Sequence, residues 1–290
     1  MVSLGSEIVL KSPGTRAFFC ERLKRHFLSR CASFGVDAFV EEKGAKWHIV
    51  AGQEAEHLIL SQFGFSRLVE PKERRLLGGF PVGVGGKVVV LFSGGPDSVL
   101  ASLLVARRGN DVVLLFLDDG VEGRWERAKE AAKRVAYFLP EAKVCLYRAG
   151  FSDGLRMLQD SVRKRFMCFF CRATMLRVAE VVAKREGCLA VATGEIMGEQ
   201  ASQTYAALGL LSRVVEIPLY RPLICFNKEE VFEWLDRFGA KDDRNFSMPA
   251  CPFVPKRVAT RPEVSLSRLV RTAKAVASQI TLERVLLQAS

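Results

Sequence analysis

The first residues whose types and spacing could do chemistry form a glycine-rich run. Residues 93–98 read SGGPDS, follow the apolar run at 87–92 and precede a helical pattern. Gly94 and Gly95 would let the backbone approach a phosphate closely, and the helix start would offer amide groups and a positive dipole end. Ser93 and Ser98 would add hydroxyl donors. No Gly-Lys-Ser/Thr follows, so the run is not a Walker A loop.

Asp97 gives this run a further requirement. A carboxylate repels a bare phosphate, so its presence implies a magnesium ion or another cation between the two groups. The alternative is a tight strand-to-helix turn in which Asp97 only caps the helix.

The cysteines are the second group with chemical potential. The chain has eight, and Cys168 and Cys171 form a CxxC pair, which is ambiguous between metal and redox use. Zinc needs four ligands, but the three histidines lie within residues 26–57, so zinc would have to recruit Cys188 or Cys225. Thiolates without histidine suit an iron–sulfur cluster better. A thiol or persulfide relay and ordinary buried thiols remain alternatives.

The elements that position these residues follow a glycine-rich linker. Residues 76–86 hold five glycines and a proline, which disfavours a helix or a central strand. Residues 87–258 alternate strand and helix patterns and predict an α/β, doubly wound parallel sheet, with a ligand crevice at the carboxyl ends of its strands. The expected strands are 87–92, 112–117, 144–147, 189–192 and 214–217, and the expected helices are 97–108, 123–138, 153–165, 171–186 and 228–238.

The chain on either side of this unit has its own patterns. Residues 1–75 predict a small α+β domain of ferredoxin-like type. Residues 259–290 predict a basic C-terminal helix, with the helical pattern over 264–288. In the first domain we expect strands at 6–10, 36–41 and 46–51 and helices at 15–34 and 54–63.

The charge of the chain favours a polyanionic partner. Lys plus Arg number 43 against 32 Asp plus Glu, which gives a formal net charge of +11, and nucleic acid is the simplest such partner. Candidate contacts are Arg156, Arg163, Lys164, Arg165 and the C-terminal helix. The longest apolar runs are too short to span a membrane, and the N-terminus does not resemble a signal peptide. We therefore expect a cytoplasmic protein without a membrane partner.

Four strings together carry a family resemblance. Residues 93–98 resemble the signature of the PP-loop ATP pyrophosphatases, which adenylate a substrate oxygen and release pyrophosphate. The other strings are CFFCR at 168–172, ATGEIMGEQASQT at 192–204 and RPLICFNK at 221–228. Over residues 85–258 the set resembles the tRNA sulfurtransferases, or tRNA 4-thiouridine synthetases. GSEIVLK at 5–11, with Arg16 and Phe19, is similar to the N-terminal ferredoxin-like domain of that family.

The resemblance implies roles for individual residues and implies ATP and Mg²⁺ as cofactors. Asp97 and the turn around it would bind pyrophosphate and magnesium, Lys228 would be needed for adenylation, and Cys251 would be the active-site cysteine. Asn227 replaces the usual aspartate before Lys228. Positions that match nucleotide-binding residues of the family are Leu91, Phe92, Ser93, Gly94, Gly95, Asp97, Ser98, Phe116, Leu117, Arg172, Gly194 and Gln203.

From the sequence we expect no counterpart of two domains that other members of the family have. A C-terminal rhodanese domain, which delivers persulfide sulfur in some members, is not expected, so sulfide or another persulfide carrier would be the donor. Rhodanese-lacking archaeal members imply an iron–sulfur cluster held by Cys168, Cys171 and Cys251. The 76–86 linker occupies the position of the THUMP domain, which binds tRNA in that family. A partner protein or a homodimer would therefore have to supply the missing tRNA contacts.

The sequence therefore predicts an ATP-dependent enzyme that adenylates a tRNA uridine and replaces its O4 with sulfur to give 4-thiouridine. One alternative is a PP-loop enzyme that adenylates a small molecule. Another is an RNA-binding accessory protein without turnover, which the presence of Asp97, Lys228 and Cys251 disfavours.

Overall fold

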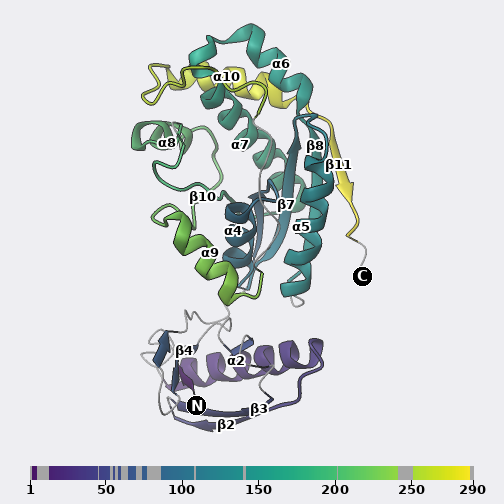
Figure 1. The fold of residues 1–290 in the computed structure, drawn as a ribbon, viewed down its shortest axis with the longest axis vertical. Helices are drawn as coiled ribbons and strands as arrows, with labels where there is room; N and C mark the ends of the chain where they lie inside the picture. The colour runs from purple at the N-terminus through teal and green to yellow at the C-terminus, as the bar shows by residue number, and fades with distance from the viewer. Residues whose placement is uncertain are drawn as a thin grey trace.

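The computed structural model of this chain contains two sheets with their helices, the smaller below the larger in Figure 1. Phe34 and Tyr137 meet edge-to-face between the two parts, with ring centroids 5.5 Å apart. The structure describes residues 2–4, 13–44, 46–52, 55, 58–59, 65–69, 74–76, 86–107, 109–139, 142–200, 202–240 and 251–287.

The N-terminal part is a five-stranded antiparallel sheet with one long described helix. Strand order is β2-β3-β1-β4-β5, and every neighbouring pair is antiparallel. The first four strands have the order of a ferredoxin-like sheet, and Leu23, Phe27 and Trp47 are buried at its centre. Its elements are β1 Val2–Leu4, α2 Pro13–Ser33, β2 Ala38–Lys43, β3 Lys46–Ala51, β4 Phe65–Val69 and β5 Arg74–Leu76.

The expectations for this part fall into two groups. The helix at 15–34 and the strands at 36–41 and 46–51 are confirmed within a few residues. The strand expected at 6–10 and most of the helix expected at 54–63 lie outside the described residues, as does most of the linker.

The C-terminal part is a six-stranded sheet with order β10-β9-β6-β7-β8-β11. Five strands are parallel, and β11 pairs antiparallel with β8. The strands are β6 Lys87–Leu91, β7 Asp111–Asp118, β8 Val144–Gly150, β9 Ala190–Ala192, β10 Leu219–Tyr220 and β11 Leu282–Val285. The helices are α4 Pro96–Ala106, α5 Arg124–Phe138, α6 Ser152–Ser161, α7 Met167–Glu186, α8 Tyr205–Leu211, α9 Lys228–Arg237 and α10 Leu266–Ala277, with a 3₁₀ turn η2 Lys164–Phe166.

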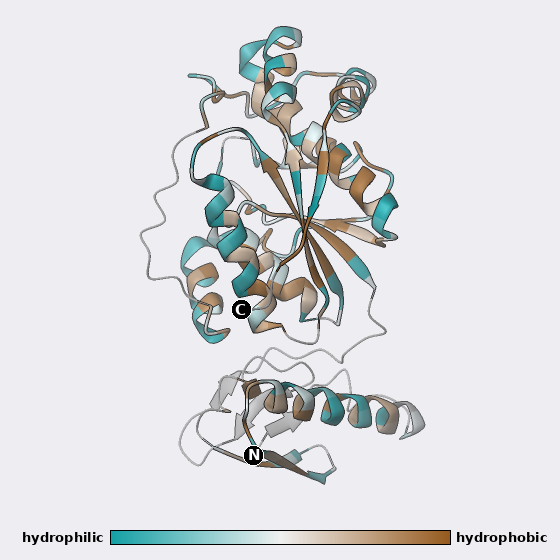
Figure 2. Ribbon diagram, turned by 90° about the vertical axis from the view of Figure 1, so that its right-hand side faces the viewer, coloured by the Kyte–Doolittle hydropathy of each residue, from teal (hydrophilic) through white to brown (hydrophobic). Residues whose placement is uncertain are grey.

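Strand alternation divides the apolar residues of this sheet between two cores. Val89, Val113 and Leu115 pack with α6, α7, α8 and α10, whereas Val88 and Leu114 pack with α4, α5 and α9. Because both faces are covered, the strands are apolar along most of their length, as Figure 2 shows. The predicted α/β sheet with helices on both faces is confirmed.

Three expectations for this part were wrong. Residues 214–217 form no strand: Val214 and Val215 are buried in a turn, and the strand comes later, as β10. The helix expected at 153–165 breaks at Val162 into α6 and η2. The basic helix over 264–288 ends at Ala277, because the chain then forms β11 and covers the open edge of β8.

Within the described residues, no helix has the length and apolar character needed to cross a membrane.

Candidate functional site

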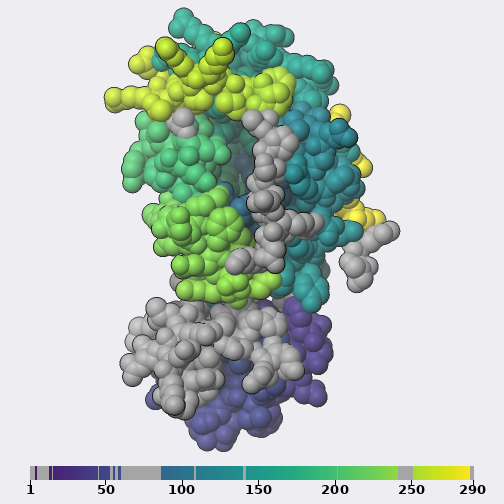
Figure 3. Space-filling view, in the orientation of Figure 1, coloured from purple at the N-terminus to yellow at the C-terminus, as the bar shows by residue number. Residues whose placement is uncertain are grey.

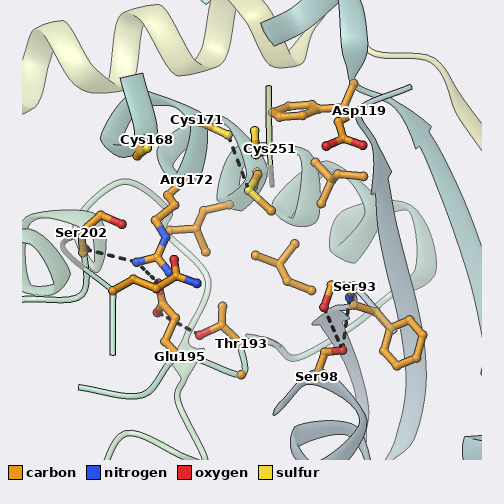
Figure 4. Close-up of a pocket in the computed structure, with 18 of the residues that line it drawn as sticks. Ser93, Ser98, Asp119, Cys168, Cys171, Arg172, Thr193, Glu195, Ser202 and Cys251 are labelled. Atoms are coloured by element: carbon orange, nitrogen blue, oxygen red, sulfur yellow. Dashed lines mark hydrogen bonds and ion pairs between the residues drawn. The ribbon is translucent and has the colours of Figure 1, made fainter. Parts of the chain in front are cut away.

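A pocket of about 400 Å³ lies at the carboxyl ends of β6, β7 and β9, where a parallel sheet is expected to bind its ligand. Figure 4 shows the phosphate-type turn on one side and the thiols of α7 on the other. Gly94, Gly95 and Lys228 are not among the lining residues, although Lys228 contacts Asp97, which is. The predicted site residues that line the pocket are Leu91, Phe92, Ser93, Asp97, Ser98, Phe116, Leu117, Cys168, Cys171, Arg172, Gly194, Gln203 and Cys251.

The turn at 93–98 is closed by its own polar groups. The Ser93 amide donates to Ser98 Oγ at 3.2 Å, and Ser98 Oγ donates to the Gly95 carbonyl at 2.9 Å. Gly94 has a φ of +77°, and a Cβ there would lie 2.9 Å from Ala128 Cα. Gly95 is the N-cap of α4, so no N-cap side chain competes with an anion for the first helical amides.

Gly194 brings a second segment against this turn. A Cβ at Gly194 would lie 2.9 Å from both the carbonyl carbon and the oxygen of Asp97, and 3.1 Å from the Ser98 amide nitrogen. Real Cβ atoms are essentially never found below 3.0 Å from such atoms. The residue must therefore be glycine for the loop after β9 to pack directly on the start of α4.

Lys228 lies between two carboxylates behind the turn. Its Nζ donates to both Asp97 carboxylate oxygens, at 2.7 and 2.8 Å, and approaches Glu199 Oε1 at 3.0 Å. Burial alone would lower the pKa of Lys228, but the bonds to Asp97 and Glu199 raise it. Burial raises the pKa of Asp97, and the contact with Lys228 offsets part of that increase. These contacts place the Lys228 cation beside the candidate phosphate site.

Asn227 explains how Lys228 is held at the start of α9. The Asn227 side chain accepts a hydrogen bond from the Glu230 amide at 2.8 Å, and the Asn227 amide donates to Glu230 Oε2 at 2.7 Å. This capping box anchors the first turn of the helix. Asparagine caps helices as well as aspartate does, so the substitution at this position keeps the helix start.

Glu195 is a site residue that sequence reasoning missed. This buried carboxylate accepts hydrogen bonds from Thr193 Oγ1 at 2.9 Å and Arg221 Nε at 2.5 Å, and pairs with Arg172 at 3.3 Å. Arg172 also donates to the Ser202 carbonyl at 3.2 Å. A half-buried arginine held by a carboxylate and a carbonyl keeps one orientation, here towards the pocket (Figure 4). In the sequence, the one indication that Glu195 belongs to the site was its position within the 192–204 string.

Other missed residues lie around the middle of the pocket. Asp119, at the end of β7, forms an ion pair with Arg124, and both line the pocket. The position of Asp119 in the sequence could have indicated its role, because it comes shortly after Phe116 and Leu117 at the carboxyl end of a parallel strand. Phe253 and Val254 line the pocket next to Cys251.

Three thiols lie in the wall opposite the turn. Cys168 and Cys171 are the second and fifth residues of α7, and Cys251 comes from the segment before α10. Burial, and then the nearby Cys251, raise the pKa of Cys171 to about 12; the same two causes raise that of Cys168. Cys171 Sγ lies 3.9 Å from Met175 Sδ. No three His, Cys, Asp or Glu side chains among the described residues are grouped to hold a metal ion.

The comparisons with known proteins agree with this geometry. The family model described as "Thiamine biosynthesis protein (ThiI)" matches residues 83–275. A probable tRNA sulfurtransferase of Thermus thermophilus is 34% identical over 231 residues, which are 77% of this chain and 56% of that protein. The corresponding protein of Methanocaldococcus jannaschii is 31% identical over 186 residues, 63% of this chain and 49% of that one. The chain thus spans about half the length of these curated relatives.

A solved structure shows the same fold. The crystal structure of a 4-thiouridine synthetase–RNA complex with bound ATP superposes with a TM-score of 0.74, covering 98% of each chain at 20% identity. This match includes both sheets of the present chain.

Proposed function

Because this chain belongs to the ThiI family, we propose that it is an ATP-dependent tRNA sulfurtransferase that converts a tRNA uridine to 4-thiouridine. One observation carries the proposal: a phosphate-type turn and three thiols face each other across one pocket of about 400 Å³. The reaction has two parts: ATP activates the uridine O4, and a sulfur atom then replaces it. The base must therefore have the nucleotide on one side and the sulfur source on the other. The names of the curated relatives and of the ATP-bound neighbour support the same reaction.

ATP would bind with its phosphates on the turn. The open amides at the start of α4 and the hydroxyls of Ser93 and Ser98 would bind phosphate oxygens. Arg172, fixed by Glu195, adds a positive group in the pocket wall. Leu91 and Phe116, at the ends of β6 and β7, would contact the nucleoside.

Magnesium fits the carboxylate of Asp97. Carboxylate oxygens are hard donors of the kind Mg²⁺ prefers, and the ion would neutralise phosphate charge when bound. Lys228 now occupies both oxygens of Asp97. Nucleotide binding would therefore transfer Lys228 from Asp97 towards the phosphates.

The first step would form an adenylated base. The uridine O4 attacks the α phosphorus, the bond from that phosphorus to pyrophosphate breaks, and pyrophosphate leaves. Lys228 would stabilise the negative charge that develops on the five-coordinate phosphorus. Because activated bases are hydrolysed by water, the apolar wall of the pocket would protect the intermediate.

The second step would replace oxygen with sulfur. Sulfide forms the C4–S bond; the C4–O bond breaks, and that oxygen leaves with AMP. If a persulfide on Cys251 supplied the sulfur, its outer sulfur would bond to C4, and a second thiol would then attack the Cys251 sulfur, so that the S–S bond breaks, the base keeps the outer sulfur and Cys251 forms a disulfide that an added thiol reductant reduces. An iron–sulfur cluster on Cys168, Cys171 and Cys251 stays a prediction. Thiolates are its usual ligands, but the described thiols are not grouped to hold a metal, so no step is derived through it.

Pyrophosphate release, measured with the full chain, ATP and Mg²⁺, tests the proposal. We expect release that depends on unmodified tRNA, and 4-thiouridine in the tRNA when a sulfide donor is added. Release that ignores tRNA but requires a metabolite would favour a small-molecule adenylating enzyme. An absence of release under all conditions would favour an accessory RNA-binding role. A homodimer and a cytoplasmic location also stay predictions.

A further inference from the structure

Six exposed cations lie in the two segments that adjoin the thiol-bearing residues of the pocket. Three come from residues 163–165, directly before Met167 and Cys168, and three from residues 256–261, shortly after Cys251. No ion pair engages any of the six within the part of the chain that the structure describes. We call this set the rim: Arg163, Lys164, Arg165, Lys256, Arg257 and Arg261.

One hydrogen bond joins the two halves of the rim, and a second ties the 256–261 half to α8. The Ala259 amide donates to the Arg165 carbonyl at 2.9 Å, and Thr204 Oγ1 donates to the Thr260 carbonyl at 2.5 Å. Thr204 is the N-cap of α8. Figure 3 shows residues 251–277, in yellow-green, at the top of the view and next to α8. The rim is therefore a built surface with a fixed relation to the pocket.

The pocket reaches solvent at Val254, which lies in the chain between Cys251 and the rim residues at 256–261. Val254 lines the pocket, yet 54% of its surface is exposed. Phe253 also lines the pocket and is half-buried. An aromatic side chain that packs partly on the core and an exposed aliphatic one thus lie in the pocket wall next to the rim segment.

A cationic surface beside an aromatic-lined opening has the chemistry for one unpaired nucleotide of an RNA. Single-stranded bases bind by stacking on aromatic rings, while basic side chains bind the backbone phosphates. An enzyme that modifies a base ring must first extrude that base from its stack. A small metabolite would need neither the six cations nor the exposed apolar group.

Resting on the proposed function, we propose that the RNA approaches from the thiol side of the pocket. Its backbone phosphates lie on the rim, and the extruded uridine enters past Phe253. The base is then between the thiols and the nucleotide. Its O4 faces the α phosphate, and one face of the ring at C4 is open to sulfur from the thiol wall, so sulfur adds to C4 first and the C4–O bond to AMP then breaks.

Charge removal on the rim gives the first test. The double variants R163Q/K164Q and K256Q/R257Q each remove two cations, and K184Q/R185Q removes two exposed cations at the far end of α7 as a matched control. The log–log salt slope of RNA binding falls by roughly 0.7–0.9 for each lost phosphate contact. We expect each rim double variant to lower the slope by about 1.4–1.8 and to raise the KM for RNA, while ATP binding and the control stay at wild-type values.

Substitution of Phe253 gives the second test. Loss of one base–aromatic contact weakens binding by about 5- to 150-fold, so F253A should raise the KM for RNA by that factor. F253Y should retain wild-type behaviour, and F253L, which keeps an apolar group but no ring, should fall between them. ATP binding, measured without RNA, should be the same in all three if the fold is intact.

The outcomes separate this proposal from the proposed function. RNA-dependent pyrophosphate release that is unchanged, within twofold, in both rim variants and in F253A would overturn the RNA path alone. A wild-type protein without any RNA-dependent release would overturn both proposals.

Discussion

Replacement of Gly194 by alanine should separate the two segments that form the nucleotide side of the pocket. The added Cβ would lie 2.9 Å from the carbonyl carbon and oxygen of Asp97, and ordinary contact begins at 3.4 Å. The loop after β9 and the start of α4 must therefore move apart by about 0.5 Å, from 3.4 − 2.9. Both partners are backbone, so no flexible side-chain end can absorb the shift.

The cost should fall on catalysis more than on folding. A misplacement of about 1 Å in a catalytic arrangement costs on the order of 100-fold in rate, so half that shift should cost on the order of 10-fold in kcat/KM for ATP. Overpacking should also destabilise the fold by about 1–3 kcal/mol. Pyrophosphate release at varied ATP concentration gives the first quantity, and denaturant unfolding gives the second.

Gly209 supplies the matched control. It lies inside α8, and a Cβ there would have no heavy atom within 4 Å. G209A should stabilise the protein by roughly 0.5–1 kcal/mol, because alanine favours the helix, and should leave the ATP kinetics unchanged. If G194A keeps kcat/KM within twofold of wild type, the argument that the two segments must touch at Gly194 is wrong.

Three further predictions concern the carboxylate and the thiols. E195Q should raise the KM for ATP by about 10-fold or more, since it removes the charged partner of Arg172. E180Q alters a similar buried ion pair on α7 away from the pocket and should leave that KM unchanged. An equal rise of KM in both variants would show that Glu195 has a purely structural role. Because the folded protein raises the pKa of Cys171 from 9.0 to about 12, it binds that proton more tightly than the unfolded chain, so stability should fall as pH rises from about 9 towards 12. C171A should lose less stability over that range in denaturant unfolding, and parallel curves would contradict the shift. C251S should abolish 4-thiouridine formation but retain pyrophosphate release, because activation precedes sulfur transfer; loss of both activities would place Cys251 in the activation step.

Local sequence signals were enough to place the pocket. The turn at 93–98 could be predicted because its residues, the strand before it and the helix after it are neighbours in the chain. Cys168, Cys171 and Arg172 could be placed in one wall because they share the first turns of one helix. In each case the information lies within about ten residues.

The features that could not be predicted depend on contacts between residues far apart in the sequence. Strand β11 forms because the edge of β8 is open, a partner more than 130 residues away along the chain. Glu195 acts through Arg172 and Arg221, which are 23 and 26 residues distant, so no local pattern reveals its bonds. The same holds for Lys228, whose contact with Asp97 spans 131 residues.

The segment from Thr193 to Thr204 has a thermodynamic consequence. Gly194 packs on Asp97, Glu199 pairs with Lys228, Glu195 holds Arg172, and Thr204 holds the segment that carries half of the rim. A stretch of a dozen residues therefore borders both ligands of the proposed reaction. Any free energy that couples the two must be reciprocal: if RNA tightens ATP by some factor, ATP must tighten RNA by the same factor.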